Sequence, residues 1–318
     1  MLTEVIKLYP DREDVTLTTY VIAEKGELHA QGERPAVLIC PGGGYFNCSD
    51  REAEPVALKF ASMGYHAFVL RYSTYDEGKN QFPDLSRPIE PKEKTKHPAP
   101  VRDIGKAMLY IREHAQEWAV DMKRVAVCGF SAGAHNSAMY SVCWNTPLLT
   151  DFFKVDAEML RPAAVILGYT LSDYIFMSGV KKNEMDAAFF AASNTAFLGE
   201  PDPSEERLRE VSPALNVTEN TPPTFLWATA ADGLVPVQHS LRMAHALADH
   251  KVPFEIHIFE EGDHGLSVST QASALSRNMI DQDAEKWVRL AECWLAKRFT
   301  LNLPEKTEFE IMLEKGQL

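Results

Sequence analysis

The sequence predicts an α/β fold in which helices cover both faces of a mostly parallel central sheet. The main observation is that short apolar runs, which suit buried strands, alternate with segments of helical character between Pro35 and Arg298. The length of 318 residues lies within the range of one such domain with insertions. The composition, 45% apolar and 24% charged, is that of an ordinary globular protein. We therefore expect a single domain over residues 1–318, with its core at about 35–298.

The predicted elements begin with an antiparallel pair of strands at 4–9 and 15–23, after which strands and helices alternate. The first helix, 50–63, has Ser49 or Asp50 as its N-cap and ends at Gly64, a residue type suited to helix ends. The remaining expected strands are 35–40, 65–72, 124–128, 163–167, 223–230 and 254–259. The remaining expected helices are 99–118, 132–142, 239–249 and 281–298. This repetition of strand and helix indicates parallel pairing.

Three segments interrupt the alternation. Residues 73–97 are polar and rich in Pro and Lys, and we expect a loop there. Residues 171–215 lie between two core strands and contain apolar pieces such as Ala187-Ala188-Phe189-Phe190, so we interpret them as a small helical cap. Residues 299–318 form a C-terminal tail whose structure the sequence does not determine.

The net charge and the cysteine content limit which binding partners and which cellular compartment we expect for this protein. The formal charge of −13 argues against nucleic acid or an anionic membrane surface as a partner, because both require a basic patch. The N-terminus lacks the pattern of a secretory signal, and no apolar run is long enough to span a bilayer. The five cysteines have no C-x-x-C spacing, so we expect a reduced, cytoplasmic setting and no metal site.

One motif indicates the reacting atom. Residues 129–133 read Gly-Phe-Ser-Ala-Gly, the G-x-S-x-G pattern, directly after a strand-like run and before a helical segment. In this pattern a serine occupies a tight turn between strand and helix, and the glycines leave room for the backbone. We therefore predict that Ser131 is a nucleophile. The alternative is an incidental serine in a tight turn.

A serine hydroxyl needs a base, and the sequence offers ten histidines. His264 is favoured because it lies in the Gly-bracketed loop after strand 254–259. We interpret the histidines on or near the preceding helix and strand as structural or surface residues: His239, His245, His250 and His257. Asp232, after strand 223–230, is the expected carboxylate partner of His264, although it could simply cap the next helix. Asp263 is too close to His264 in the chain to orient it easily.

The glycine run after strand 35–40 suits the stabilisation of a developing oxyanion. In Pro41-Gly42-Gly43-Gly44-Tyr45 only glycines allow the backbone amides to approach a substrate carbonyl closely. We predict that the amides of Gly43, Gly44 and Ala132 form the oxyanion hole. A phosphate-binding loop is disfavoured, because the G-x-G-x-x-G spacing fails and no Lys-Ser/Thr follows. Tyr45 and Tyr169 are candidate substrate-binding residues at the same edge of the sheet, with simple packing under the cap as the alternative.

Together these motifs resemble the α/β-hydrolase superfamily, and within it esterases of the hormone-sensitive-lipase and bacterial acetyl-xylan or feruloyl esterase type. Residues 41–45 resemble the family's H-G-G-G-[WY] loop, and residues 129–135 are similar to G-F-S-A-G-G-H. Asp232-Gly233-Leu234-Val235-Pro236 and His264-Gly265 match the other two segments of the triad, in the chain order of this superfamily. Pro41 departs from the usual histidine, so support for the oxyanion loop must come from elsewhere. Ala134 replaces a glycine, and His135 is expected to pack near the site without acting as a base.

The resemblance implies an α/β-hydrolase fold, hydrolysis of carboxylic esters with small acyl groups, often acetyl groups on sugars, and no cofactor. The expected partner is therefore a small-molecule ester, and homo-oligomerisation stays open. Two alternatives also stay open. One is an aminopeptidase or amidase on the same fold, and the other is a non-catalytic binding protein that keeps the hydrolase frame.

Overall fold

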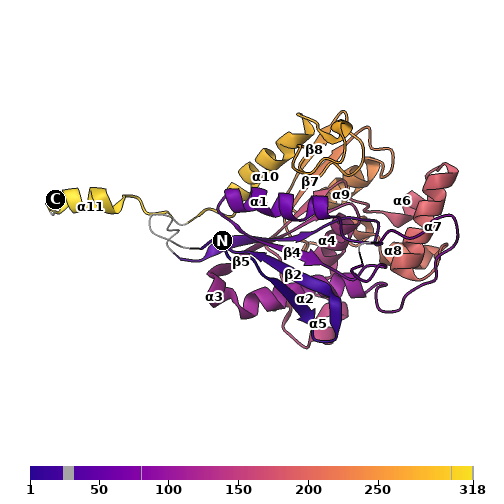
Figure 1. The fold of residues 1–318 in the computed structure, drawn as a ribbon, viewed down its shortest axis with the longest axis horizontal. Coiled ribbons are helices and arrows are strands. Elements are labelled where there is room, and N and C mark those ends of the chain that lie inside the picture. The colour runs from indigo at the N-terminus through magenta and orange to yellow at the C-terminus, as the bar shows by residue number, and fades with distance from the viewer. Residues whose placement is uncertain (24–31, 80, 302, 317–318) are drawn as a thin grey trace.

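The computed structural model describes residues 1–23, 32–79, 81–301 and 303–316. Positions 80, 302 and 317–318, which belong to the predicted loop and tail, lie outside them. The described residues form an eight-stranded sheet in the order β1-β2-β4-β3-β5-β6-β7-β8 (Figure 1). The strands are β1 Val5–Tyr9, β2 Arg12–Tyr20, β3 Arg34–Cys40, β4 His66–Arg71, β5 Val120–Phe130, β6 Ala164–Gly168, β7 Thr224–Thr229 and β8 Phe254–Phe259.

The sheet is mostly parallel, as the sequence predicts. β1 and β2 form an antiparallel hairpin, and β2 pairs antiparallel with β4. All other neighbouring strands pair in parallel. Every residue of β3 and β6 is buried, and residues 36–40 of β3 and all of β6 are continuous apolar runs, the pattern of parallel strands that are covered on both faces.

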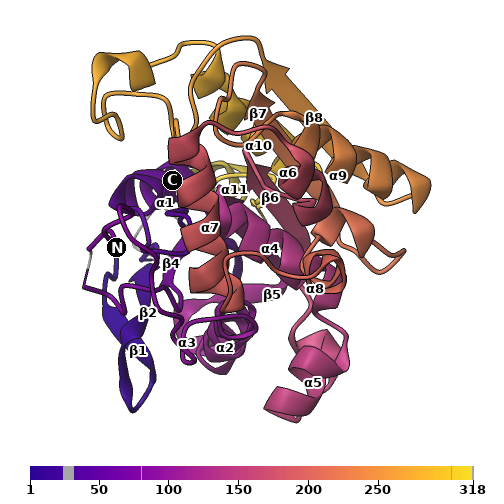
Figure 2. The same cartoon turned by 90° about the vertical axis from the view of Figure 1, so that its right-hand side faces the viewer.

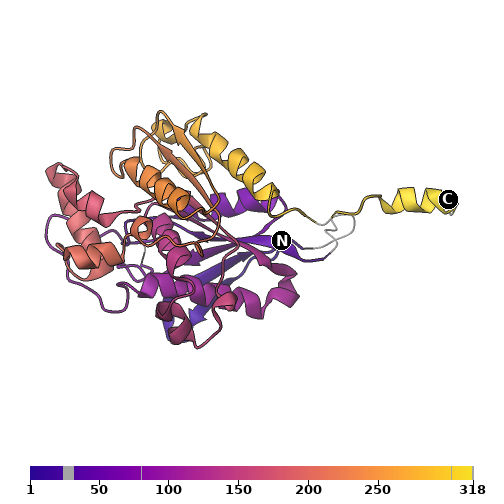
Figure 3. The ribbon, with the colours of Figure 1, turned by 180° about the vertical axis from the view of Figure 1, so that it is seen from behind.

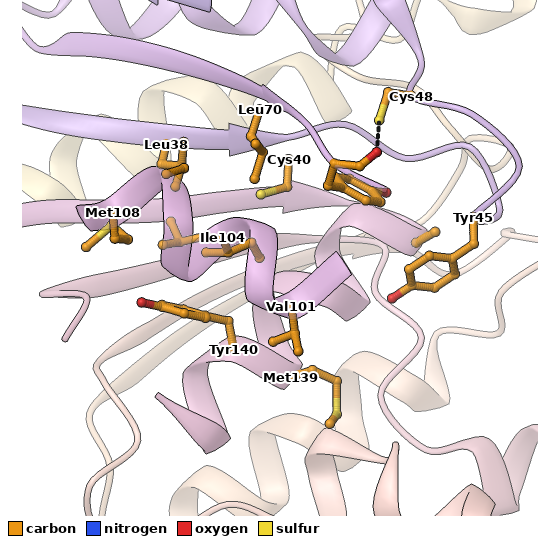
Figure 4. Packing of buried hydrophobic residues seen from close by; sticks show 14 of the residues in the cluster. Leu38, Cys40, Tyr45, Cys48, Leu70, Val101, Ile104, Met108, Met139 and Tyr140 are labelled. Carbon is orange, nitrogen blue, oxygen red and sulfur yellow. Dashed lines mark hydrogen bonds between the residues drawn. The ribbon is translucent and has the colours of Figure 1, made fainter. Parts of the chain in front are cut away.

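The helices lie on both faces of the sheet. α1 (Glu54–Ser62), which follows the 3₁₀ turn η1 (Asp50–Glu52), packs on one face with α10 (Trp287–Ala296). α2 (Ala99–Glu113), α4 (Ala132–Cys143) and α9 (Gln238–Asp249) cover the other face. Figure 4 shows part of this second layer, where Leu38 and Leu70 of the sheet face Ile104 and Met108 of α2. The short helices α3 (Ala115–Trp118) and α5 (Pro147–Phe153) complete this side.

The helical segments differ from the prediction in several places. The expected helix 50–63 is divided into η1 and α1, and the N-cap of α1 is Ala53 instead of the predicted Ser49 or Asp50. The expected helix 99–118 is divided at His114 into α2 and α3. The expected closing helix 281–298 is shorter, because residues before Trp287 form turns and the 3₁₀ segment η5 (Ala284–Lys286). α5 was not predicted, although Thr146 before Pro147 is a typical signal for a helix start.

The segment 171–215 contains the helices α6 (Tyr174–Gly179), α7 (Glu184–Leu198) and α8 (Glu205–Glu210). Figure 2 shows α7 lying across the end of the sheet. Asn183 caps the first turn of α7 through its side chain, and Gly199 ends the helix with a φ of 91°. We use the name "cap" for residues 171–215 from here on.

The C-terminal residues leave the body of the domain. Figure 3 shows α11 (Glu308–Glu314) standing away from the sheet and its helices. Thr307 and Glu310 form a capping box at its start. In the described part of the chain, no helix combines the length and the apolar character needed to cross a membrane.

Candidate active site

Ser131 occupies the turn between β5 and α4. Its backbone has φ 51° and ψ −121°, a conformation that L-residues adopt at a cost. The flanking glycines are required by close contact, since a Cβ atom on Gly133 would lie 2.1 Å from the carbonyl oxygen of Cys40. A Cβ atom on Gly129 would lie 2.2 Å from the carbonyl oxygen of Gly133. The local geometry is therefore that of a nucleophile elbow.

The structure brings Ser131, Asp232 and His264 together from the ends of β5, β7 and β8. The distance between Ser131 Oγ and His264 Nε2 is 2.7 Å. On the other side of the ring, His264 Nδ1 lies 2.7 Å from Asp232 Oδ2. One imidazole thus connects the hydroxyl to the carboxylate, which is the arrangement in which a histidine can take the serine proton.

Asp232 binds both His264 and the turn that follows it, but it does not cap the next helix, because the N-cap of α9 is Val237. Its Oδ1 accepts hydrogen bonds from the backbone amides of Leu234 and Val235, at 3.0 and 2.9 Å. Its Oδ2 accepts from His264. The carboxylate is buried, and the two amides determine which of its oxygens faces the imidazole.

The buried histidines near the site serve other partners. His135 lies 2.5 Å from the hydroxyl of Tyr45 through Nδ1 and 2.8 Å from the carbonyl oxygen of Val211 through Nε2. Burial lowers its pKa to about 3, so the ring is neutral at ordinary pH. His239 is also buried, with its pKa lowered to about 3, and it accepts from the amides of Ser172 and Asp173.

The predicted oxyanion loop passes beside Ser131. Gly43 and Gly44 have φ values of 137° and 63°, in the region that favours glycine. Gly44 and Ala132 line the cavity that contains Ser131, and Ala132 is the first residue of α4, where helix geometry leaves the amide without a partner in the helix. Gly43 is not among the described residues that line this cavity, and its carbonyl oxygen accepts from the amide of Phe46.

Three side chains support the loop where the related motif has a histidine. The hydroxyl of Tyr72 donates to the carbonyl oxygen of Pro41 at 2.7 Å. A carboxylate oxygen of Glu52 accepts from the amide of Gly42, also at 2.7 Å. Ser193 of α7 donates to the carbonyl oxygen of Gly44 at 2.9 Å and so connects the loop to the cap. Sequence reasoning missed all three, because no local motif marks Tyr72, Glu52 or Ser193 as a partner of this loop.

The cavity beside Ser131 is small, about 30 Å³, and mostly apolar. The cap contributes Leu171, Tyr174, Phe189, Phe190 and Ser193, and the loop after β7 contributes Leu234 and Val235. Tyr45 lines the cavity as expected, with its ring stacked on Phe197 at 4.1 Å between centroids.

Tyr169 lies elsewhere. Tyr169 is not one of the described residues that line the cavity. Its hydroxyl is directed to Glu52, at 2.5 Å, and its ring is buried against Trp227. Its ring also meets the ring of His264 edge-on, at 5.0 Å between centroids. The expectation that Tyr169 contacts substrate is therefore replaced by a position behind the base. Burial and the neighbouring Glu52 carboxylate raise the pKa of Tyr169 well above its ordinary value.

In the part of the chain that the structure describes, no group of three or more His, Cys, Asp or Glu side chains is placed to hold a metal ion. The chemistry that the arrangement can perform is that of an activated serine beside backbone donors.

Comparisons with known proteins agree with this arrangement. The protein named endo-1,4-beta-xylanase B of Butyrivibrio fibrisolvens is 33% identical over 245 residues, which cover 74% of this chain and 33% of that protein. A carboxylesterase structure from Lactobacillus plantarum WCFS1 superposes with a TM-score of 0.76 at 26% identity, covering 96% of this chain and 100% of that one. The acetyl ester-xyloside bifunctional hydrolase of Caldicellulosiruptor lactoaceticus gives a TM-score of 0.69 at 28% identity, covering 92% of this chain and 96% of that one. The chain spans about a third to a half of the length of the curated relatives it matches.

These similarities confirm the predicted α/β-hydrolase fold and the resemblance to esterases of the acetyl-xylan esterase type. The BD-FAE family model matches residues 27–247, which is more than half of the chain. This chain therefore belongs to the BD-FAE family.

Proposed function

We propose that this chain is a serine carboxylic-ester hydrolase that removes short acyl groups, acetyl above all, from small carbohydrate esters. The observation that carries the proposal is the position of His264, within 2.7 Å of both Ser131 Oγ and Asp232 Oδ2.

In the first half of the reaction Ser131 Oγ attacks the ester carbonyl carbon while its proton passes to His264 Nε2. Asp232 Oδ2 accepts the Nδ1–H of the resulting imidazolium and stabilises its charge. The tetrahedral intermediate then collapses, the bond to the alcohol oxygen breaks, and the alcohol leaves with the proton from Nε2. In the second half the same nitrogen takes a proton from a water molecule, whose oxygen attacks the acyl carbon. The bond between Ser131 Oγ and that carbon then breaks, Oγ takes back the proton from Nε2, and the carboxylic acid leaves.

The negative oxygen of both tetrahedral intermediates needs donors that are already in place. Ala132 and Gly44 line the same cavity as Ser131, and we assign their amides to this role together with the amide of Gly43. The positive end of the α4 dipole lies at Ala132 and favours the same charge.

The cavity supports the choice of a short acyl group. The cavity between Ser131 and the aromatic residues of α7 has a volume of only about 30 Å³, which favours a short acyl group over a long chain. The carbohydrate part of the proposal rests on the relatives, two of which are named as a xylanase and an acetyl ester-xyloside hydrolase.

The test is a series of p-nitrophenyl esters from acetate to octanoate, followed by acetylated oligosaccharides. We expect acetate to be preferred and Ser131→Ala to lose nearly all activity, as loss of the nucleophile costs about 10⁶-fold in subtilisin. Ser62→Ala, an exposed serine of α1, is the matched control. Preference for octanoate, or full activity of Ser131→Ala, contradicts the proposal. Faster cleavage of aminoacyl-nitroanilides than of acetate esters would instead indicate an amidase.

A further inference from the structure

The 3₁₀ turn η1 lies between the two loops on which the proposed reaction depends. It comes shortly after the oxyanion loop in the chain, and it contacts the segment after His264 through hydrogen bonds that span more than 200 residues. Arg51 and Glu52, adjacent residues of this turn, make separate connections to the two loops.

Arg51 attaches η1 to the segment that carries the base. Its guanidinium donates to the carbonyl oxygen of Gly265, the residue after His264, at 3.1 Å. It also donates to the carbonyl oxygen of Ser273 at 2.9 Å. In return, the hydroxyl of Ser267 donates to the carbonyl oxygen of Arg51 at 2.6 Å. The turn and the segment 265–273 are thereby held in one arrangement.

Glu52 connects the same turn to the oxyanion loop. Its side chain is buried, with a residue exposure of 3%, and each carboxylate oxygen has one partner. Oε2 accepts from the amide of Gly42, and Oε1 accepts from the hydroxyl of Tyr169. The Tyr169 oxygen in turn accepts from the amide of Ser267 at 3.0 Å, while the Tyr169 ring supports His264 from behind.

We propose that Glu52, acting with Tyr169, is a positioning residue that sets the oxyanion loop in place relative to His264. The inference rests on the proposed esterase function. The bond from Gly42 to Glu52 sets the start of the glycine run, and the bond from Glu52 to Tyr169 relates that run to the base. Because donors in an oxyanion hole act through their exact placement, a displacement of about 1 Å at this point costs about 10²-fold in rate.

A glutamine cannot replace Glu52 without loss. A carboxylate accepts at both oxygens, whereas an amide accepts at one and donates at the other. If the amide nitrogen faced Gly42, two donors would meet. If it faced Tyr169, the hydroxyl would have to accept from the amide while already accepting from Ser267, and its own proton would lose its partner.

The test compares Glu52→Gln, Tyr169→Phe and the double variant with wild type, using p-nitrophenyl acetate. Glu54→Gln, an exposed carboxylate two residues away, is the matched control. Active sites are counted with a fluorophosphonate probe, so that rates refer to folded, reactive molecules. We expect kcat to fall about ten- to hundredfold in each single variant with KM changed by less than about twofold.

Two further readouts separate positioning from a general loss of stability. A trifluoromethyl ketone, which forms an oxyanion with the serine, should bind more weakly in proportion to the loss of kcat/KM. The double variant should lose little more than either single variant, because both remove the same hydrogen bond. If Glu52→Gln does not fold, Tyr169→Phe, which keeps the ring against His264, decides the question.

The outcomes distinguish the two proposals. Wild type that neither reacts with the probe nor hydrolyses esters overturns the proposed function and this inference with it. Active wild type with Glu52→Gln and Tyr169→Phe matching Glu54→Gln overturns the inference alone. A raised KM at unchanged kcat, or additive losses in the double variant, also overturns it.

Discussion

Replacing Asp232 with asparagine is expected to reverse the hydrogen bonding of His264 without disturbing the fold. Asp232 Oδ1 accepts from the amides of Leu234 and Val235, and an asparagine oxygen can keep both bonds. The asparagine nitrogen must then face His264 Nδ1, where it donates. That donor requires an unprotonated Nδ1, so the ring proton moves to Nε2. A protonated Nε2 can no longer accept the proton of Ser131.

The magnitude follows from this reversal. The analogous change in trypsin, where the geometry is also kept, lowers kcat about 10⁴-fold. That factor corresponds to about 5.4 kcal/mol of lost transition-state stabilisation. The stability cost should be small, because the buried side chain keeps its volume and two of its three hydrogen bonds.

The measurement is kcat for p-nitrophenyl acetate, with the melting temperature recorded beside it. Asp263→Asn is the matched control, because Asp263 is the exposed neighbour of His264 and should not orient it. Activity of Asp232→Asn within tenfold of wild type would refute the reasoning. So would an equal loss in Asp263→Asn.

Three further predictions concern stability and acyl selectivity. His135→Leu should lower the free energy of unfolding by about 2–6 kcal/mol, because the buried Tyr45 hydroxyl and Val211 carbonyl both lose their partner; urea unfolding measures this, and a change below about 1 kcal/mol contradicts it. Phe190→Ala should enlarge the cavity and shift the ratio of hexanoate to acetate turnover about tenfold or more toward hexanoate. The exposed Phe152→Ala is its control, and an unchanged ratio would show that Phe190 does not limit chain length. Finally, the free energy of unfolding should fall as the pH drops from about 6.5 toward 3, because the unfolded chain then binds protons that the folded chain does not. Burial lowers the pKa to about 4 at His66 and to about 3 at His97, His135 and His239. Burial also raises the pKa of Asp103 to about 6, so this one group stabilises the fold as the pH falls and opposes the four histidines. Unfolding free energies that stay level between pH 7 and pH 4 would contradict this.

The residues at the ends of strands were predictable from the sequence because local signals specify them. Ser131 lies in a motif whose glycines have a steric cause, and Asp232 and His264 each follow an apolar run at the point where it breaks. Parallel strands bring their carboxyl ends to one edge, so the convergence of the three follows from the fold class.

Residues whose roles depend on distant partners were not predictable in this way. Glu52 reads locally as an ordinary residue near a helix start, yet its partner Tyr169 is 117 positions away. Tyr169 was expected to contact substrate because it follows β6, but its hydroxyl is directed to Glu52. The start of β5 at Val120, earlier than the predicted 124, likewise reflects pairing with Arg34 of β3. The local sequence does not indicate which distant residues will be in contact.

Ser131 follows a central strand of the sheet, whereas His264 follows an edge strand. β5 lies between β3 and β6, whereas β8 is a terminal strand with no fully buried residue. Local opening begins where few apolar contacts hold an element. On mild heating, the sheet edge formed by β8 and the loop that carries His264 can therefore open locally while Ser131 stays in place. Catalytic activity would then be lost below the melting temperature of the whole protein and would return on cooling. Turnover therefore reports the local opening of this edge, which spectroscopy of the whole molecule would not detect.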